Sequence, residues 1–187
     1  SGEAVFSGAG YVSVADSASL KPTASTFTYA TWVRYSTTTL NQRIMQKYDA
    51  TNGWIILTED GAANGFLKTY VRTASGFTGL SGTSNHADGL LHLAMVVGDG
   101  TNVTLYVDNV QEAQTAQTGN LVNSSQPLMF GTNETASGGF YTGKARTAAF
   151  WSQALNSTDR AAYFNGGTPL DYPFVAAVQN SNFLMHG

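Results

Sequence analysis

Short apolar runs separated by turn-forming residues are the feature of this sequence that most constrains its fold. The separating residues tolerate a positive φ, and several come as pairs between two apolar runs: Asn52-Gly53, Asp60-Gly61, Asn64-Gly65, Asp99-Gly100 and Asp108-Asn109. Pairs of this kind close tight turns between antiparallel strands. Many short strands with turn signals between them are typical of a β-sandwich or a β-barrel.

The predicted strands are distributed along the chain up to residue 151. The clearest is the run from Asn102 to Val107, which alternates polar and apolar residues and ends at the Asp108-Asn109 turn. This alternation is typical of a half-buried antiparallel strand that continues into a hairpin. The predicted strands are residues 3–6, 11–14, 27–35, 43–47, 54–58, 66–72, 90–98, 101–107, 127–131 and 140–151.

One short helix is predicted after the last strand, over residues 156–164. Asn156 is a favourable N-cap, Asp159 places an acidic residue in the first turn, and Gly166-Gly167 ends the helix. A single turn over residues 15–20 is the other helical expectation. Together these elements predict an all-β, two-sheet antiparallel sandwich. We expect residues 1–170 to form this domain and residues 171–187 to form a C-terminal extension or tail.

The composition excludes several classes of function. Only 11% of the residues are charged, the net charge is −3, and the nine Lys and Arg residues are scattered. Nucleic-acid binding relies on clustered cations, so no nucleic-acid partner is expected. No run approaches the roughly 18 consecutive apolar residues of a membrane-spanning helix, so no membrane insertion is expected. The absence of cysteine excludes thiol catalysis, disulfide bonds and cysteine-based zinc sites.

Several motifs follow one another in a recognisable order between residues 4 and 167. In chain order they are 6–8 (Phe-Ser-Gly), 11–14 (Tyr-Val-Ser-Val), 27–33 (Phe-Thr-Tyr-Ala-Thr-Trp-Val), 44–47, 53–57 (Gly-Trp-Ile-Ile-Leu), 92–97 (His-Leu-Ala-Met-Val-Val), 104–108 (Thr-Leu-Tyr-Val-Asp), 140–143 (Phe-Tyr-Thr-Gly) and 148–163. This order resembles the laminin G-like members of the concanavalin A-like lectin/glucanase superfamily. The resemblance implies a jelly-roll sandwich that requires no cofactor and has a glycan as its default ligand.

Two departures from the family pattern stand out. Leu91 replaces the usual tryptophan, and residues 143–147 lack the acidic pair that joins a calcium site in relatives, so the resemblance does not supply that site. Calcium is left open as an alternative, because the loops are rich in the oxygen ligands that calcium prefers. These are Asp16, Asp49, Asn52, Asp60, Asn64, Asp88 and Asn133. Turn formation explains each of them equally well, and no metal ligand is assigned.

No catalytic residue is predicted, and the chain is not expected to be an enzyme. Glycan-cleaving members of the superfamily need two carboxylates on one face of the sheet. The glutamates of this chain are isolated, and Glu59 and Asp60 would point to opposite faces if they lay on a strand. A hydrolase would require Glu59 or Glu134 to face a second carboxylate.

The histidines do not form a recognisable catalytic motif either. Ser84, His86 and Asp88 alternate within a polar loop, whereas a catalytic triad needs side chains that converge from different segments. His92 lies in an apolar strand, where we expect a core or edge histidine with a structural role.

The first functional hypothesis is a carbohydrate-binding or adhesion module of the lectin kind. Sugar sites pair an aromatic ring with amides and carboxylates, and function in sandwiches gathers at loops. The candidates are Tyr48, Trp54, Tyr70, Phe77 and Tyr141, with Asn52, Asn64 and Asn133 as polar partners. Trp54 follows a turn and is expected to be half-exposed. Core packing is the alternative for each aromatic residue.

The second hypothesis is a structural protein of a virion, such as a phage decoration, fibre or tail domain, that binds a neighbouring protein shell. The low charge, the absence of cysteine and the apolar C-terminal extension favour it. The contact would be made by strand addition or by filling a groove, and an oligomer is left open. Both hypotheses place the protein outside the cell, on a cell surface or on a virion. The residues expected to contact the partner are Phe174, Val178, Phe183 and Leu184.

Overall fold

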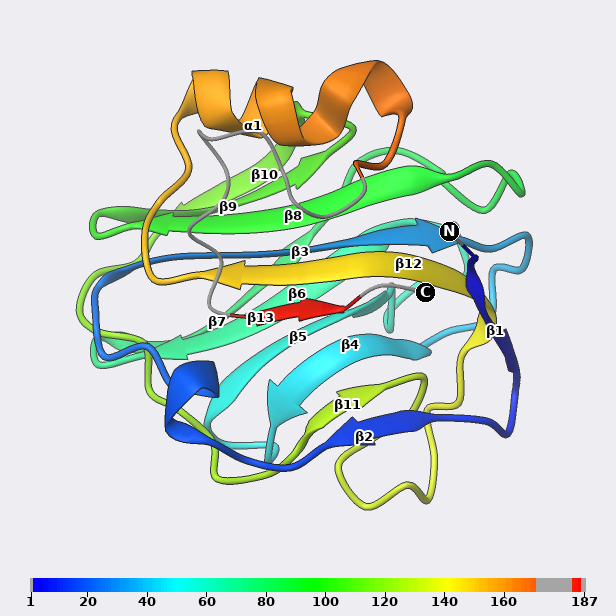
Figure 1. The fold of residues 1–187 in the computed structure, drawn as a ribbon, viewed down its shortest axis with the longest axis horizontal. Helices are drawn as coiled ribbons and strands as arrows, with labels where there is room; N and C mark the ends of the chain where they lie inside the picture. The colour runs from blue at the N-terminus through cyan, green and yellow to red at the C-terminus, as the bar shows by residue number, and fades with distance from the viewer. Residues whose placement is uncertain (1, 171–182, 186–187) are drawn as a thin grey trace.

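A computed structural model describes residues 2–170 and 183–185, which form two antiparallel sheets and one short helix (Figure 1). The predicted all-β jelly-roll sandwich is confirmed. The seven-stranded sheet consists of β1 (Ala4–Ser7), β12 (Thr142–Trp151), β3 (Thr26–Arg34), β8 (His92–Asp99), β9 (Asn102–Val107) and β10 (Val110–Ala116), with β13 (Phe183–Met185) also paired to β12. The six-stranded sheet consists of β2 (Val12–Val14), β11 (Leu128–Phe130), β4 (Arg43–Tyr48), β5 (Gly53–Thr58), β6 (Leu67–Thr73) and β7 (Gly76–Ser81).

The predicted hairpin and helix signals act as expected. Asp108 and Asn109 both have positive φ, 51° and 65°, and join β9 to β10 with Val107 opposite Val110. The side chain of Asn156 accepts hydrogen bonds from the backbone N–H groups of Thr158 and Asp159 and caps α1 (Ser157–Phe164). Short 3-10 turns lie at η1 (Ala18–Leu20), before β3, and at η2 (Asn165–Gly167), after α1. The first lies within the segment where one turn was predicted.

Besides β13, two strands of the described chain, β7 and β10, were not predicted. Both are edge strands: β7 ends the six-stranded sheet, and β10 ends the seven-stranded sheet. An edge strand buries little of its surface, so its sequence needs no strong apolar pattern. Glycine and exposed residues interrupt β7, and β10 contains mainly polar and small residues.

The main core lies between the two sheets. Trp54 is at its centre, with its ring stacked on Tyr29 at 4.3 Å between centroids and on Phe150 at 5.8 Å. A second apolar cluster forms on the outer face of the seven-stranded sheet, where Trp32 and Trp151 pack against Tyr163 and other residues of α1. Helix α1 therefore covers the outer face of this sheet, as Figure 1 shows above β8 and β9. None of the described helices is both long and apolar enough to cross a membrane.

Part of the C-terminal segment pairs with its own chain. In β13, Phe183 lies opposite Phe150 and Leu184 opposite Ala149, both on β12. Their backbone is thus placed in the sheet of the same molecule, and the expectation that these two residues contact a partner chain stays a prediction. Phe174 and Val178 lie outside the described residues, and the proposed boundary at residue 170 stays a prediction.

Candidate functional site

Three aromatic side chains meet on the outer face of the six-stranded sheet. The rings of Tyr70 and Phe77 stack at 5.2 Å between centroids and 11° between planes, and Tyr48 stacks on Phe77 at 6.1 Å. Phe77 is 43% exposed, so this group presents an apolar ring to solvent. We call Tyr48, Tyr70 and Phe77 the aromatic platform.

Strand register explains why these residues share one face. Ile55 pairs with Tyr70, which in turn pairs with Gly79, and residues directly opposite on neighbouring strands lie on the same face of a sheet. Ile55 and Leu57 are buried beneath the platform. A Cβ atom at position 79 would lie only 2.5 Å from the ring of Tyr70, so glycine allows this ring to lie flat across β7.

A group of charged side chains borders the platform. Lys68 Nζ lies 3.0 Å from Glu59 Oε1 and 2.5 Å from Asp60 Oδ1, and the hydroxyl of Tyr70 donates a 2.7 Å hydrogen bond to Asp60 Oδ2. The Lys68 ammonium also lies 5.0 Å from the centre of the Tyr70 ring. We call Glu59, Asp60 and Lys68 the charged cluster. It fixes the orientation of Tyr70 and places polar atoms beside the exposed ring of Phe77.

Glu59 and Asp60 were expected to point to opposite faces if they lay on a strand, and the structure does not place them on one. Strand β5 ends at Thr58, so both residues lie in the turn that follows and do not alternate between faces. Both carboxylates therefore reach the same ammonium group.

The carboxyl group of Glu59 is held in its ionised form. Burial opposes ionisation, but hydrogen bonds from Ser81, Lys68 and the backbone N–H groups of Gly61 and Asp60 outweigh this effect. They lower the pKa of Glu59 from 4.5 to about 2. A general acid in glycan hydrolysis needs a raised pKa, so Glu59 is not suited to that role.

This lowered pKa is expected to make stability depend on pH. A carboxyl group with a depressed pKa in the folded state stabilises the fold above the pKa of the unfolded chain, and that contribution is lost as the pH falls. Between about pH 5 and pH 2 we expect Glu59 to account for a loss of about 2–3 kcal/mol in the free energy of unfolding. Urea unfolding of the protein and of Glu59→Gln at several pH values measures it. The variant should be less stable near pH 7 and indistinguishable near pH 2. A constant difference across this range would contradict the assignment.

A polar contact lies in the row of residues next to the platform. The amide of Gln46, which pairs with Ile55, donates to Glu134 Oε2 at 3.3 Å and accepts from Arg43 at 3.4 Å. Glu134 belongs to the loop between β11 and β12, so this loop reaches the same face of the sheet. Gln46 and Lys68 were not singled out from the sequence, because nothing in their local pattern marks them as neighbours of the platform.

Two aromatic candidates from the sequence lie in the core and not at the site. Trp54 is only 2% exposed, because strand alternation points it between the sheets while its neighbour Ile55 faces outward, and the expectation of a half-exposed ring is wrong. Tyr141 is fully buried, and its hydroxyl donates hydrogen bonds to the carbonyl oxygens of Arg34 and Lys144. Neither ring is accessible to a ligand.

The three asparagine candidates are placed in separate turns. Asn64 accepts a hydrogen bond from Phe66 N, and Asn133 accepts one from Ser137 N, so each amide closes its own loop. Asn52 lies in the turn that joins β4 to β5. The structure therefore brings together Tyr48, Tyr70 and Phe77, whereas the side-chain oxygens of Asn64 and Asn133 bond within their own loops.

The carboxylates considered for calcium also serve separate purposes. Asp16 contacts Lys47, Asp60 contacts Lys68, and Asp88 contacts His92. Asp49 accepts hydrogen bonds from the backbone of the β4–β5 turn. These contacts do not bring the four aspartates together as ligands of one calcium ion, and calcium binding stays an open alternative.

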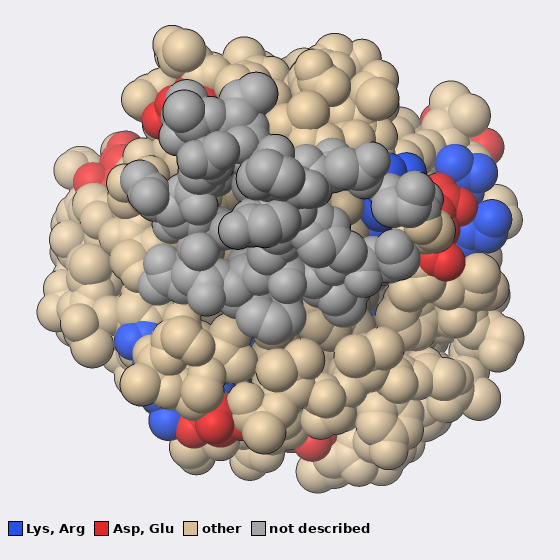
Figure 2. Space-filling model, in the orientation of Figure 1, with Lys and Arg blue, Asp and Glu red and all other residues tan. Residues whose placement is uncertain are grey.

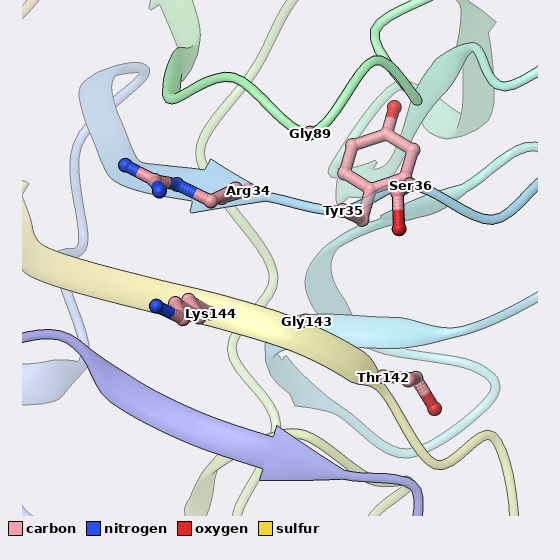
Figure 3. Close-up of a pocket in the computed structure, with 7 residues that line it drawn as sticks. All are labelled: Arg34, Tyr35, Ser36, Gly89, Thr142, Gly143 and Lys144. Carbon is pink, nitrogen blue, oxygen red and sulfur yellow. The ribbon is translucent and has the colours of Figure 1, made fainter.

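A cavity of about 250 Å³ lies elsewhere, at one end of β3 and β12 (Figure 3). It is lined by Arg34, Tyr35, Ser36, Gly89, Thr142, Gly143 and Lys144. Glu3 contacts both cations, Arg34 at 3.1 Å and Lys144 at 3.2 Å, and therefore offsets their charge. The ring of Tyr35 is buried and offers no exposed stacking surface.

Figure 2 shows acidic and basic groups interspersed on the visible face, without an extended patch of one sign.

The two antiparallel sheets and the single helix over one outer face define an all-β sandwich domain. The sequence model described as the concanavalin A-like lectin/glucanases superfamily matches residues 6–159, and the chain belongs to this superfamily. A comparison with curated proteins finds no match.

Solved structures share this fold at low sequence identity. A Bacteroides ovatus protein provisionally described as carbohydrate-binding is similar with a TM-score of 0.72 and 14% identity, over 98% of this chain and 50% of that one. Domains LG4-5 of mouse laminin alpha1 give a TM-score of 0.60 and 14% identity, over 82% and 44%. The binding domain of botulinum neurotoxin DC in complex with SialylT gives 0.62 and 12%, over 84% and 39%. The chain thus spans half or less of the length of these structures.

Proposed function

We propose that this chain is a non-catalytic carbohydrate-binding domain that holds a glycan on the aromatic platform. The observation that carries the proposal is the exposed ring of Phe77, stacked on Tyr70 and bordered by the charged cluster. A binding site for a small ligand combines apolar surface with a few well-placed polar groups. The apolar face of a sugar ring would pack on Phe77, and its hydroxyl groups would bond to the adjacent polar side chains.

The polar groups next to the platform suit hydroxyl recognition. Asp60 supplies carboxylate oxygens that accept hydrogen bonds, and Lys68 supplies N–H donors. The amide of Gln46 is fully buried and is not available to a ligand. Asp60 and Lys68 are already oriented by neighbours, since Lys68 contacts Glu59 and Asp60, and the hydroxyl of Tyr70 donates to Asp60. A site held in place before its ligand arrives loses less conformational entropy on binding.

The similar structures support this proposal through what is stated of them. One is provisionally described as carbohydrate-binding, and another is a toxin binding domain in complex with SialylT. A domain of this kind would meet its glycan in the extracellular space or on a cell surface, where it could serve adhesion. The alternative of a virion protein that binds a neighbouring shell through Phe174, Val178, Phe183 and Leu184 stays a prediction.

A glycan array tests the proposal, followed by titration of the best glycan against variants. Phe77→Ala is expected to weaken binding at least about tenfold, because truncating a central aromatic contact commonly costs more than 1.4 kcal/mol. Val110→Ala is the matched control, since Val110 is an exposed apolar residue of β10 in the other sheet. Lys144→Ala tests the cavity as the rival site.

The outcomes separate the alternatives. Loss on Phe77→Ala with full binding by Val110→Ala and Lys144→Ala supports the platform. Loss on Lys144→Ala alone would move the site to the cavity. A folded protein that binds no glycan on the array would contradict the proposed function.

A further inference from the structure

Two histidines and an aspartate that belong neither to the platform nor to the charged cluster converge in the fold. His86 comes from the loop between β7 and β8, His92 is the first residue of β8, and Asp108 lies in the β9–β10 turn. One nitrogen of each histidine and one carboxylate oxygen of Asp108 all lie within 4.8 Å of one another. The two imidazole rings are 4.7 Å apart between centroids. Within residues 2–170 these side chains form the group whose donor atoms are suited to a metal ion.

Each histidine has an outer nitrogen bonded to a different carboxylate. His86 Nε2 lies 2.8 Å from Glu112 Oε1, and His92 Nε2 lies 3.0 Å from Asp88 Oδ1. On the inner side, His92 Nδ1 lies 2.7 Å from Asp108 Oδ2. Metal-binding histidines in proteins almost always donate their second N–H to a carboxylate, a carbonyl or water, which fixes the ring. Glu112 and Asp88 are placed to do this, which leaves the Nδ1 atoms for an ion.

The backbone holds these groups in position. Asp108 Oδ1 accepts a hydrogen bond from Leu93 N at 2.8 Å, and Glu112 Oε2 accepts one from Thr83 N at 3.1 Å. His86 and His92 are each only 9% exposed, whereas the side chains of Asp88 and Asp108 are partly open to solvent. An ion could therefore reach the histidines from the side of the two aspartates.

The charges of the group also favour a dication. Three carboxylates, those of Asp88, Asp108 and Glu112, surround two imidazoles, so the group remains negative even if both rings are protonated. Imidazole nitrogen is a ligand for zinc, copper and nickel, whereas calcium takes oxygen ligands.

We propose that His86, His92 and Asp108 bind one divalent transition-metal ion of the zinc type. The ligands would be Nδ1 of each histidine and a carboxylate oxygen of Asp108, with water in the fourth position of a tetrahedral site. The proton now shared between His92 and Asp108 is released to solvent when the ion binds. The site joins the β7–β8 loop to the β9–β10 turn, and a bound ion would link the edges of the two sheets.

Cobalt is the probe, because Co²⁺ occupies zinc sites and absorbs visible light strongly when four-coordinate. The chain without an affinity tag is treated with chelator, dialysed and titrated with Co²⁺. We expect the absorbance of a four-coordinate ion to saturate at one Co²⁺ per chain and to disappear when Zn²⁺ is added. Zn²⁺ alone should raise the melting temperature, since a ligand that binds only the folded state stabilises it.

Variants locate the site and control for folding. His86→Gln and Asp108→Asn should each abolish the cobalt absorbance, and Glu112→Gln should weaken binding about 10- to 100-fold. Asp108→Asn keeps an oxygen to accept from Leu93 N, so it should fold, which circular dichroism in chelator verifies. The third histidine of the chain, His186, supplies the matched control: His186→Ala should bind as the parent does.

Three results would overturn the proposal. They are a weak, octahedral cobalt spectrum in the parent protein, unchanged binding by folded His86→Gln and Asp108→Asn, and loss of binding in His186→Ala.

Discussion

Replacing Trp54 with alanine is expected to lower the free energy of unfolding by about 3–5 kcal/mol. Trp54 lies between the sheets with its ring stacked on Tyr29 and Phe150, so truncation leaves a cavity that these neighbours can fill only in part. Trp54→Phe is the matched control. The indole Nε1 has no hydrogen-bond partner among the described residues, so phenylalanine loses packing area only and should cost about 1–2 kcal/mol.

Denaturant unfolding of the three proteins measures these differences. The comparison also distinguishes a core role from a ligand role. Phe77→Ala should change stability far less than Trp54→Ala, because Phe77 is partly exposed, yet it should reduce glycan binding. A folded Trp54→Ala protein that kept its stability and lost glycan binding would contradict the structure at this position.

Replacing Lys47 with methionine is expected to cost about 2–4 kcal/mol in the free energy of unfolding. Lys47 is only 1% exposed, and its ammonium group contacts Asp16 at 2.6 Å and the carbonyl oxygens of Ser124 and Gln126, each at 2.8 Å. Burial lowers the pKa of Lys47, and the contact with Asp16 offsets part of that effect. Methionine fills a similar volume but leaves two carbonyl oxygens without a donor, and a buried unpaired polar group is costly.

Lys21→Met is the control for this substitution. Lys21 contacts the same carboxylate, Asp16, but it is partly exposed, and ion pairs near the surface contribute little to stability. Chemical unfolding of both variants should give a large change for position 47 and a small one for position 21. Equal effects would show that the pairing with Asp16, and not the buried carbonyl contacts, dominates the role of Lys47.

Local sequence signals predicted the structure correctly where the interactions that form an element lie within one short segment. The positive φ values of Asp108 and Asn109 follow from residue types that tolerate them, and the cap at Asn156 follows from a side chain that reaches its own helix. Similarly, alternation from Asn102 to Val107 is a property of one strand. Strands β7 and β10 were not predicted, because edge strands need little apolar pattern and their sequences therefore contain no clear strand signal.

The site could be predicted only in part, since aromatic type was visible and orientation was not. Tyr48 and Tyr70 were candidates together with Trp54 and Tyr141, and all four are aromatic residues within or near strands. Alternation shows that Trp54 and Ile55 face opposite ways, but it does not show which of the two faces is packed against another sheet. The platform therefore became recognisable only once both faces of the six-stranded sheet had been assigned.

The proposed metal site of His86, His92 and Asp108 shows a second limit of prediction from the sequence. His86 and Asp88 were assigned to a polar loop and His92 to an apolar strand, and each assignment describes its own segment. Their partners Asp108 and Glu112 lie farther along the chain, at the β9–β10 hairpin.

The sequence by itself determined the class of fold, the positions of most strands, the tight turns and the capped helix, because these depend on interactions between residues close together in the chain. Only the tertiary structure decided which aromatic rings are exposed and which histidines converge. Those properties depend on the register between strands and on which sheet face is covered, and both are set by packing between segments far apart in sequence. The aromatic platform on β4, β6 and β7 is thus a product of strand pairing.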